Sequence, residues 1–251
     1  MDLLLHNGLG DFIICNSLIR IFCKQYDHIN VFVVDHNFNS VNFMFRDIKN
    51  LNYIVWGHDK SVKFIGNITE ENSDFYKWYI NNISRGLHGL LNDEGVGSYN
   101  INDKKIIKIT NQSLPFDQSF YQCVNIDFEK RWTDFYFERN LEEEKNVFYN
   151  ILGLKDDEEF IFVHDDRSRG FSINESKIES SIKIIRPDNK DFSIFDYLYT
   201  IEKAKEVHCM NSSFICLIDT MQLNTGEKYY HRYIRGYNCD PTLKLKWKLI
   251  D

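Results

Sequence analysis

Short apolar runs alternate with stretches of helical periodicity along the whole chain of 251 residues, and this alternation limits the fold more than any other feature. A helix that follows a strand returns the chain to a parallel neighbouring strand, so repeated alternation is typical of parallel sheets covered by helices. The expected strands span residues 3–6, 30–35, 51–56, 104–110, 159–164, 182–186, 206–210 and 229–234. The expected helices span residues 11–25, 40–48, 73–83, 115–124, 141–152, 193–204 and 212–221. The sequence therefore predicts an α/β fold.

The alternating pattern restarts near residue 155. The helix expected at 141–152 ends at Gly153, an acidic turn follows at 156–159, and a new apolar strand begins at Phe160. Parallel sheets bind ligands beyond the carboxyl ends of their strands. We therefore predict two Rossmann-like domains, residues 1–140 and residues 141–251, that face a cleft in which substrates bind.

Charge and apolar content exclude several classes of partner. The net charge of −7 argues against nucleic acid, because such binding needs a clustered basic surface. The N-terminal residues lack the cationic start and apolar core of a signal peptide, and no apolar stretch approaches the roughly 20 residues that span a bilayer. The six cysteines are scattered without a C-x-x-C pair, as in a reducing compartment. We expect a cytoplasmic protein without a transmembrane segment.

The first apolar run ends in a turn that contains Gly8, Gly10 and Asp11, directly before an apolar helix. Glycines allow a sharp turn and let a ligand approach main-chain N–H groups, and the helix N-terminus adds a positive dipole end. The turn therefore predicts a ligand site at the head of the first helix, although any α/β domain has a first turn of this kind. Asp11 is interpreted as a general base or, alternatively, as a helix N-cap.

Two polar segments follow strand ends in the second half. Residues 165–170 (Asp-Asp-Arg-Ser-Arg-Gly) follow the strand at 159–164, and an Asn-Ser-Ser triplet follows the strand at 206–210. Guanidinium groups match phosphate oxygens, and hydroxyls at a helix start can hold a diphosphate through neutral hydrogen bonds. The alternatives are a charged turn whose acids and arginines pair with one another, and ordinary helix capping. The predicted donor-binding residues are Arg167, Arg169, Asn211, Ser212 and Ser213, together with Gly8 and Gly10 of the first turn.

Four further side chains are candidates for contact with an acceptor. Arg131 and Trp132 lie in a segment that mixes charge and aromatics before the predicted boundary, and packing is its alternative interpretation. His88 lies in a glycine-containing loop, for which a solvated loop is the alternative, and His6 ends the first strand. No D-x-D pattern follows a strand, so we expect no metal ion and no cofactor.

The turn Gly8-Leu9-Gly10-Asp11 before an apolar helix resembles the N-terminal signature of the heptosyltransferase-type glycosyltransferases of GT-B fold. In that family this aspartate is regarded as the base that deprotonates the acceptor hydroxyl. Residues 164–169 are also similar, more loosely, to the H-x-R-R motif of fucosyltransferases, whose arginine holds the diphosphate of GDP-fucose. The arginine spacing differs from that motif, and the lysine-bearing motif of the heptosyltransferase donor half is missing. The resemblance implies a GT-B arrangement with the nucleotide sugar bound by the second half.

The chemistry of glycosyl transfer fits these residue types. It needs a base near the acceptor oxygen and cationic or hydrogen-bonding groups for the departing diphosphate. We expect a metal-independent glycosyltransferase that moves a sugar from a nucleotide-diphosphate donor to a carbohydrate acceptor. Three alternatives stay open: a sugar-nucleotide epimerase, a non-catalytic nucleotide-sugar-binding protein, and a methyltransferase that uses residues 8–10 as its cofactor loop.

Overall fold

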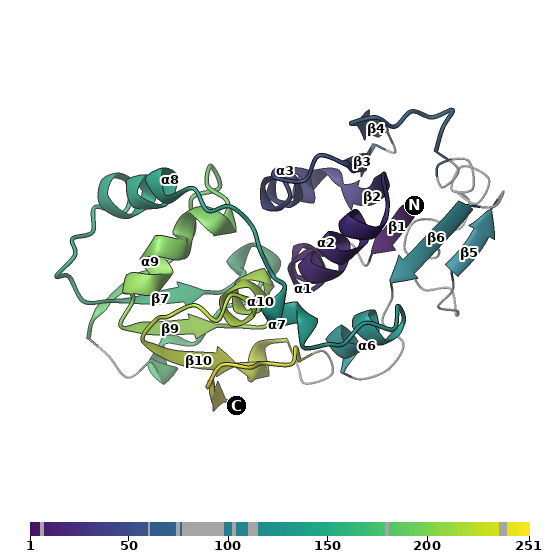
Figure 1. The fold of residues 1–251 in the computed structure, drawn as a ribbon. Helices are drawn as coiled ribbons and strands as arrows, with labels where there is room; N and C mark the ends of the chain where they lie inside the picture. The colour runs from purple at the N-terminus through teal and green to yellow at the C-terminus, as the bar shows by residue number, and fades with distance from the viewer. Residues whose placement is uncertain are drawn as a thin grey trace. The chain divides into compact units, whose positions relative to one another are not determined.

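The chain forms two compact units, Met1–Phe137 and Glu138–Asp251 (Figure 1). The computed structural model describes residues 1–5, 8–59, 61–73, 76, 98–101, 104–109, 115–178, 181–235 and 240–251, and for 98–101 and 104–109 it describes the backbone. Helix α8 (Leu141–Asn146), which is capped by Asn140, lies near the start of the second unit. Among the helices described, none is long and apolar enough to cross a membrane.

The first unit contains a six-stranded sheet in the order β4-β3-β2-β1-β6-β5. The four inner strands are parallel, and the outer strands β4 and β5 run antiparallel to their neighbours. The central strand β1 is buried along its whole length, which explains its continuous apolar run. The strands are β1 (Asp2–Leu5), β2 (Ile29–Val34), β3 (Leu51–Trp56), β4 (Val62–Ile65), β5 (Ser98–Ile101) and β6 (Lys104–Ile109).

Helices α1 (Leu9–Ile14) and α2 (Asn16–Gln25) follow β1, so the helix expected at 11–25 is broken at Cys15. The apolar residues that predicted this helix are buried: Phe12, Ile13, Ile14, Leu18, Ile19 and Phe22. The unit also contains helices α6 (Phe116–Gln122) and α7 (Lys130–Thr133).

Helix α3 (Asp35–Met44) begins earlier than the predicted start at residue 40. Its first turn begins with Asp35, His36 and Asn37, three residue types of weak helix propensity. Asn37 of this turn is nevertheless buried, and Phe38 packs edge-on against Tyr53 of β3 with ring centroids 5.4 Å apart. These tertiary contacts outweigh the local propensity.

The second unit contains a five-stranded parallel sheet in the order β11-β10-β9-β7-β8. After β7 the chain forms β8 on one side and then returns to form β9 on the other side of β7. This reversal makes the carboxyl ends of β7 and β9 a topological switch point, the usual place of ligands in such sheets. The strands are β7 (Phe160–His164), β8 (Lys183–Ile185), β9 (Glu206–Cys209), β10 (Glu227–His231) and β11 (Lys248–Ile250).

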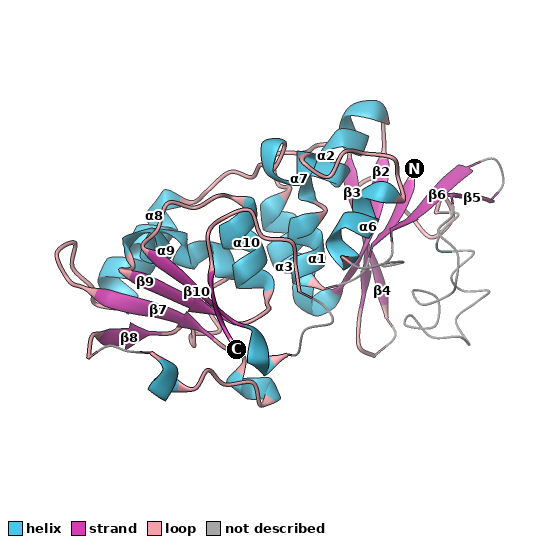
Figure 2. Ribbon diagram, turned by 90° about the horizontal axis from the view of Figure 1, so that it is seen from below, coloured by secondary structure: helices cyan, strands magenta, loops and turns pink. Residues whose placement is uncertain are grey.

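The two faces of this second sheet are covered differently (Figure 2). Helices α9 (Leu198–Lys203) and α10 (Ser213–Thr220) lie with α8 on one face, where Phe162 packs against Phe214 with ring centroids 5.7 Å apart. The opposite face is covered by the chain between β7 and β8, which forms short 3₁₀ turns. That side holds a smaller apolar cluster of Ile161, Val163, Ile173 and Ile178.

Candidate functional site

The carboxyl ends of β7 and β9 bring two polar segments together in the second unit. His164 is the last residue of β7, and Ser212 is the N-cap of α10, which follows β9. The Oγ atom of Ser212 and the Nδ1 atom of His164 lie 3.0 Å apart. The basic loop at 165–170 and the hydroxyl cluster at 211–213 therefore meet at one edge of the sheet.

His164 is held in its neutral form at this edge. Its ring lies against Phe214 with centroids 4.2 Å apart, and burial lowers its pKa to about 4 against the opposing effect of Asp165 and Asp166. A neutral imidazole has one donor and one acceptor nitrogen, so it can hold the Ser212 hydroxyl in a defined orientation. Sequence reasoning assigned His164 no role, although it ends the strand before the basic loop.

The basic loop after β7 is a closed turn that presents its arginines outward. Asp166 and Phe171 exchange two backbone hydrogen bonds of 2.9 Å each around the 3₁₀ turn Arg167–Arg169. Gly170 closes this turn with a φ of 79°, a left-handed conformation that favours glycine. The side chains of Arg167 and Arg169 are 49% and 62% exposed.

Both arginines make ion pairs with nearby carboxylates. Arg169 pairs with Asp166, and Arg167 lies 3.4 Å from Asp165 and 3.3 Å from Glu175. The pair of Arg167 with Glu175 is exposed on both sides, and such pairs contribute about 0–1 kcal/mol, so a phosphate can compete for this guanidinium group. The pairing matches the charged-turn alternative and still leaves both guanidinium groups accessible to an anion.

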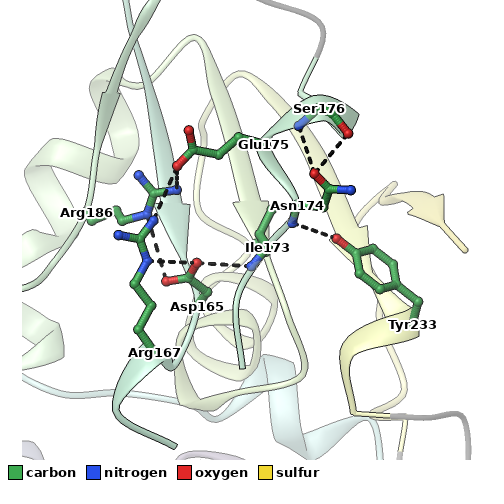
Figure 3. Close-up of polar contacts among 8 residues, drawn as sticks. All are labelled: Asp165, Arg167, Ile173, Asn174, Glu175, Ser176, Arg186 and Tyr233. Atoms are coloured by element: carbon green, nitrogen blue, oxygen red, sulfur yellow. Dashed lines mark hydrogen bonds and ion pairs between the residues drawn. The ribbon is translucent and has the colours of Figure 1, made fainter. Parts of the chain in front are cut away.

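Arg186, directly after β8, is a third arginine at this edge (Figure 3). Its Nη2 atom donates to Oε1 of Glu175 at 2.8 Å, and its Nε atom lies 3.8 Å from Oδ1 of Asp165. The side chain of Asp165 is buried and also accepts a hydrogen bond from the backbone N–H of Ile173 at 3.0 Å. Figure 3 shows the guanidinium groups of Arg167 and Arg186 converging on these two carboxylates. Sequence reasoning missed Arg186, although it ends the strand expected at 182–186.

The start of α10 adds hydrogen-bond donors to the same edge. Ser213 is the first residue of the helix, and the N–H groups of a first helical turn have no acceptor within the helix. Asn211 lies just before the cap, and its backbone carbonyl accepts a hydrogen bond from Arg235 at 3.1 Å. The positive end of the α10 dipole therefore lies beside His164.

Asp11 of the first unit stabilises the start of α1 through its carboxylate. Gly8 is the N-cap and Asp11 is the third helical residue, so the interpretation of Asp11 as the N-cap is wrong. The Gly8 carbonyl accepts hydrogen bonds from the N–H groups of Asp11 and Phe12 in the first turn. The Asp11 Oδ2 atom accepts a hydrogen bond from the Gly8 N–H at 3.1 Å. A β-carbon at Gly8 would lie 2.7 Å from this oxygen, so a larger residue there would displace the Asp11 carboxylate. Gly10 lies in the same helical turn.

The four acceptor-side candidates divide into two pairs. His6 and His88 lie outside the described residues. Arg131 and Trp132 of α7 are buried within the first unit, where Nη1 of Arg131 lies 2.7 Å from Oδ2 of the equally buried Asp117. Burial of both side chains favours packing, the alternative interpretation of this segment, over contact with an acceptor.

A buried polar chain that sequence reasoning missed runs along β9 and β10. Oε2 of Glu206 lies 3.2 Å from Nε2 of His208, and Nδ1 of His208 lies 2.9 Å from Nε2 of His231. Burial lowers the pKa of His208 and brings that of His231 to about 4. When Nε2–H of His208 donates its hydrogen bond to the Glu206 carboxylate, Nδ1 of His208 is an acceptor and Nε2–H of His231 donates to it. The Nδ1 atom of His231, which has no hydrogen-bond partner among the described residues, is then an acceptor.

The sequence matches no protein-family profile, and it matches no curated protein. The structure is similar to the crystal structure of the glycosyl transferase family 9 protein from Veillonella parvula DSM 2008, with a TM-score of 0.52 and 9% sequence identity. The match covers 99% of this chain and 86% of that chain. The likeness is one of fold. The α/β architecture with parallel sheets agrees with the fold class predicted from the sequence.

Proposed function

We propose that this protein is a glycosyltransferase that moves a sugar from a nucleotide-diphosphate donor to a carbohydrate acceptor. The observation that carries the proposal is the convergence of the basic loop after β7 with the start of α10 at the switch point of the second sheet. The similarity in fold to the glycosyl transferase family 9 protein supports the enzyme class. The turn at residues 8–11 supports it through the resemblance of its sequence to heptosyltransferase-type enzymes.

In this proposal the second unit binds the donor. Arg167 and Arg169 exchange their carboxylate partners for phosphate oxygens, and Ser212 and Ser213 donate neutral hydrogen bonds to the diphosphate. Negative charge grows on the diphosphate as the glycosidic bond to it breaks, so donors already in position lower the barrier. These groups replace the charge that a metal ion would supply, and the proposed reaction is metal-independent. Arg186, which is mostly buried between Asp165 and Glu175, positions the basic loop.

The first unit supplies the base in this proposal. Asp11 accepts the proton of the acceptor hydroxyl as that oxygen attacks the sugar. A carboxylate has about four lone-pair sites, so the hydrogen bond from the Gly8 N–H leaves capacity for this proton. Asp11 is also partly exposed, as a group that meets a substrate must be.

The donor site is tested by titration calorimetry of the full chain with UDP, GDP, ADP and CMP. Arg167→Ala and Arg169→Ala each remove charge-assisted hydrogen bonds worth roughly 1.5–3 kcal/mol, so we expect at least about tenfold weaker nucleotide binding. Lys183→Ala is the matched control, because this cation on β8 is 48% exposed and pairs with Glu158 instead. Unchanged affinity in both arginine variants would refute the donor site.

A nucleotide-sugar-binding protein without transferase activity is the second candidate. The burial of Arg131 and Trp132 favours it, because it removes two of the residues expected to meet an acceptor. NMR of a nucleotide sugar incubated with the protein and glycan acceptors separates the candidates. Release of the nucleoside diphosphate with a new glycosidic linkage supports transfer, an intact donor supports binding alone, and an altered sugar on an intact nucleotide supports the epimerase alternative.

A further inference from the structure

We propose that Asp35, His36 and His58 form a binding site in the first unit for a divalent transition-metal ion of the zinc class. Each residue offers one ligand atom, and the three atoms all lie within 4.8 Å of one another. Two imidazoles and one carboxylate are a donor set that suits zinc, cobalt or nickel rather than magnesium or calcium, which prefer oxygen ligands. The site is independent of the proposed glycosyl transfer.

Strand register explains why these residues meet. β2 and β3 are parallel, and their last residues Val34 and Trp56 are paired. Asp35 and His36 open α3 directly after β2, while His58 lies in the turn that leads from β3 to β4. The three side chains therefore gather at the carboxyl ends of two adjacent strands.

The carboxylate of Asp35 lies close to both rings. Its Oδ1 atom is 3.6 Å from Nδ1 of His36 and 3.8 Å from Nε2 of His58. The two imidazoles are stacked, with centroids 5.3 Å apart and planes 9° from parallel. Tetrahedral zinc with ligands at about 2.0–2.2 Å places neighbouring ligand atoms about 3.3 Å apart. The two nitrogen-to-oxygen distances need to shorten by about 0.3 and about 0.5 Å to reach this geometry. A metal ion lies in the plane of each imidazole that binds it, so the two exposed rings also have to rotate out of their parallel stack.

The backbone around the ligands is well defined, and their side chains are exposed enough to adjust. The Gly57 N–H donates to the Ser61 carbonyl at 2.9 Å, and the Ser61 N–H donates to Oδ1 of Asp59 at 2.9 Å, which closes the turn that carries His58. The His36 N–H donates to Oδ1 of Asp35 at 2.7 Å and orients that carboxylate. Three protein ligands leave at least one coordination position for water or another small ligand.

The test is a titration of the metal-free full chain with Zn²⁺ by calorimetry and with Co²⁺ by visible absorption. We expect one equivalent of each ion to bind. His58→Ala and Asp35→Asn should each weaken binding at least about tenfold, since even loss of a residue that supports a ligand costs 10–100-fold. His28→Ala is the control, because His28 is exposed in the same unit but lies outside the cluster, and this variant should bind as the wild type does.

Two results would overturn the site. One is equal Zn²⁺ affinity of the wild type, His58→Ala and Asp35→Asn, which would leave Asp35 and the histidines as a surface ion-pair group. The other is an intense near-ultraviolet thiolate-to-cobalt band, which would put the ion on cysteine. All three positions are exposed, so circular dichroism should show folded variants. Nucleotide titrations of the metal-free protein report on the donor site separately.

Discussion

Asp11 has a structural contact and a proposed chemical role, and one substitution separates them. Asp11→Asn retains a side-chain oxygen that accepts from the Gly8 N–H but removes the proton acceptor. Loss of a positioned base costs about 10²–10⁴-fold in rate, so we expect turnover to fall by that factor. Nucleotide affinity and melting temperature should barely change, because neither depends on the proton transfer.

The control for this variant is Asp11→Ala, which removes the contact with the Gly8 N–H as well. It should lower the melting temperature in addition to the rate, since loss of a helix-start acceptor costs about 0.5–2 kcal/mol. If Asp11→Asn keeps more than about a tenth of wild-type turnover, against the range expected for a lost base, Asp11 is a structural residue alone.

Gly226 is a residue whose small size the fold requires. It precedes β10, and its N–H donates to the Ala204 carbonyl at 3.2 Å. A β-carbon there would overlap the carbonyl oxygen of Lys205, which is backbone and cannot rotate away. We expect Gly226→Ala to lower the free energy of unfolding by at least about 3 kcal/mol, at the upper end of overpacking costs.

Gly153→Ala is the comparison for this prediction. Gly153 has a φ of 64°, and no atom lies within 4 Å of a β-carbon built on it. Gly153→Ala should therefore lower the free energy of unfolding through backbone strain alone, by about 1–2 kcal/mol. Urea denaturation of both variants measures the difference. A Gly226→Ala variant as stable as Gly153→Ala would show that β9 and β10 can separate to admit the methyl group.

At the scale of elements, the histidine contact between β9 and β10 makes the free energy of unfolding depend on pH. Burial and the charges of His208 and Lys177 bring the pKa of His231 to about 4, whereas an unfolded histidine titrates near 6.5. Between these values the unfolded state binds a proton that the folded state does not bind. His231 therefore does not reduce the free energy of unfolding above about pH 6.5. As the pH falls from there toward 4, this free energy decreases by on the order of 3 kcal/mol for one such group.

His231→Gln tests this pH dependence. The amide can still donate to Nδ1 of His208, but it does not titrate. Urea denaturation at about pH 7.5 and about pH 5 should show a smaller loss of stability in the variant than in the wild type. His28→Gln, on the exposed surface, should keep the wild-type dependence. Equal pH dependence in all three proteins would mean that His231 protonates without cost.

Elements that show apolar periodicity or turn residues in their own sequence could be predicted, whereas contacts between elements distant in the sequence could not. The turn at 8–11, the basic loop and the start of α10 stand next to apolar strands in the sequence, so their place at strand ends could be predicted. Arg186 could not be assigned, because its partners Asp165 and Glu175 precede β8 in the chain, Asp165 directly after β7 and Glu175 midway between β7 and β8. The group of Asp35 and His58 depends on the pairing of β2 with β3, which no local pattern reveals.

The short outer strands β4, β5 and β11 were also missed. β4 shows why: its side chains alternate between half-buried and exposed positions, and the strand is only four residues long. So short a segment carries almost no periodic signal. β4 forms as a strand because it pairs with β3 in an antiparallel hairpin, which its own sequence does not indicate.

At the scale of the whole molecule, the proposed glycosyl transfer needs no divalent ion, whereas the proposed metal site binds one. We expect transferase activity to persist in excess EDTA, because cationic side chains and a helix dipole hold the diphosphate. The measurement is product formation with and without the chelator, followed by addition of Mg²⁺, Mn²⁺ or Zn²⁺. If chelation abolishes turnover and Mg²⁺ or Mn²⁺ restores it, Asp165 and Asp166 must be reconsidered as metal ligands.

The pairing of β1 with β6 has a consequence for synthesis of the chain on the ribosome. Leu3 is synthesised well before its partner Ile107 on β6, which follows only after most of the first unit has been made. Until then one edge of an apolar strand has no partner and can pair with another nascent chain. In the second unit, β10 and β11 each pair with the strand formed just before them. Chaperone dependence should therefore be greatest while translation passes between β3 and β6.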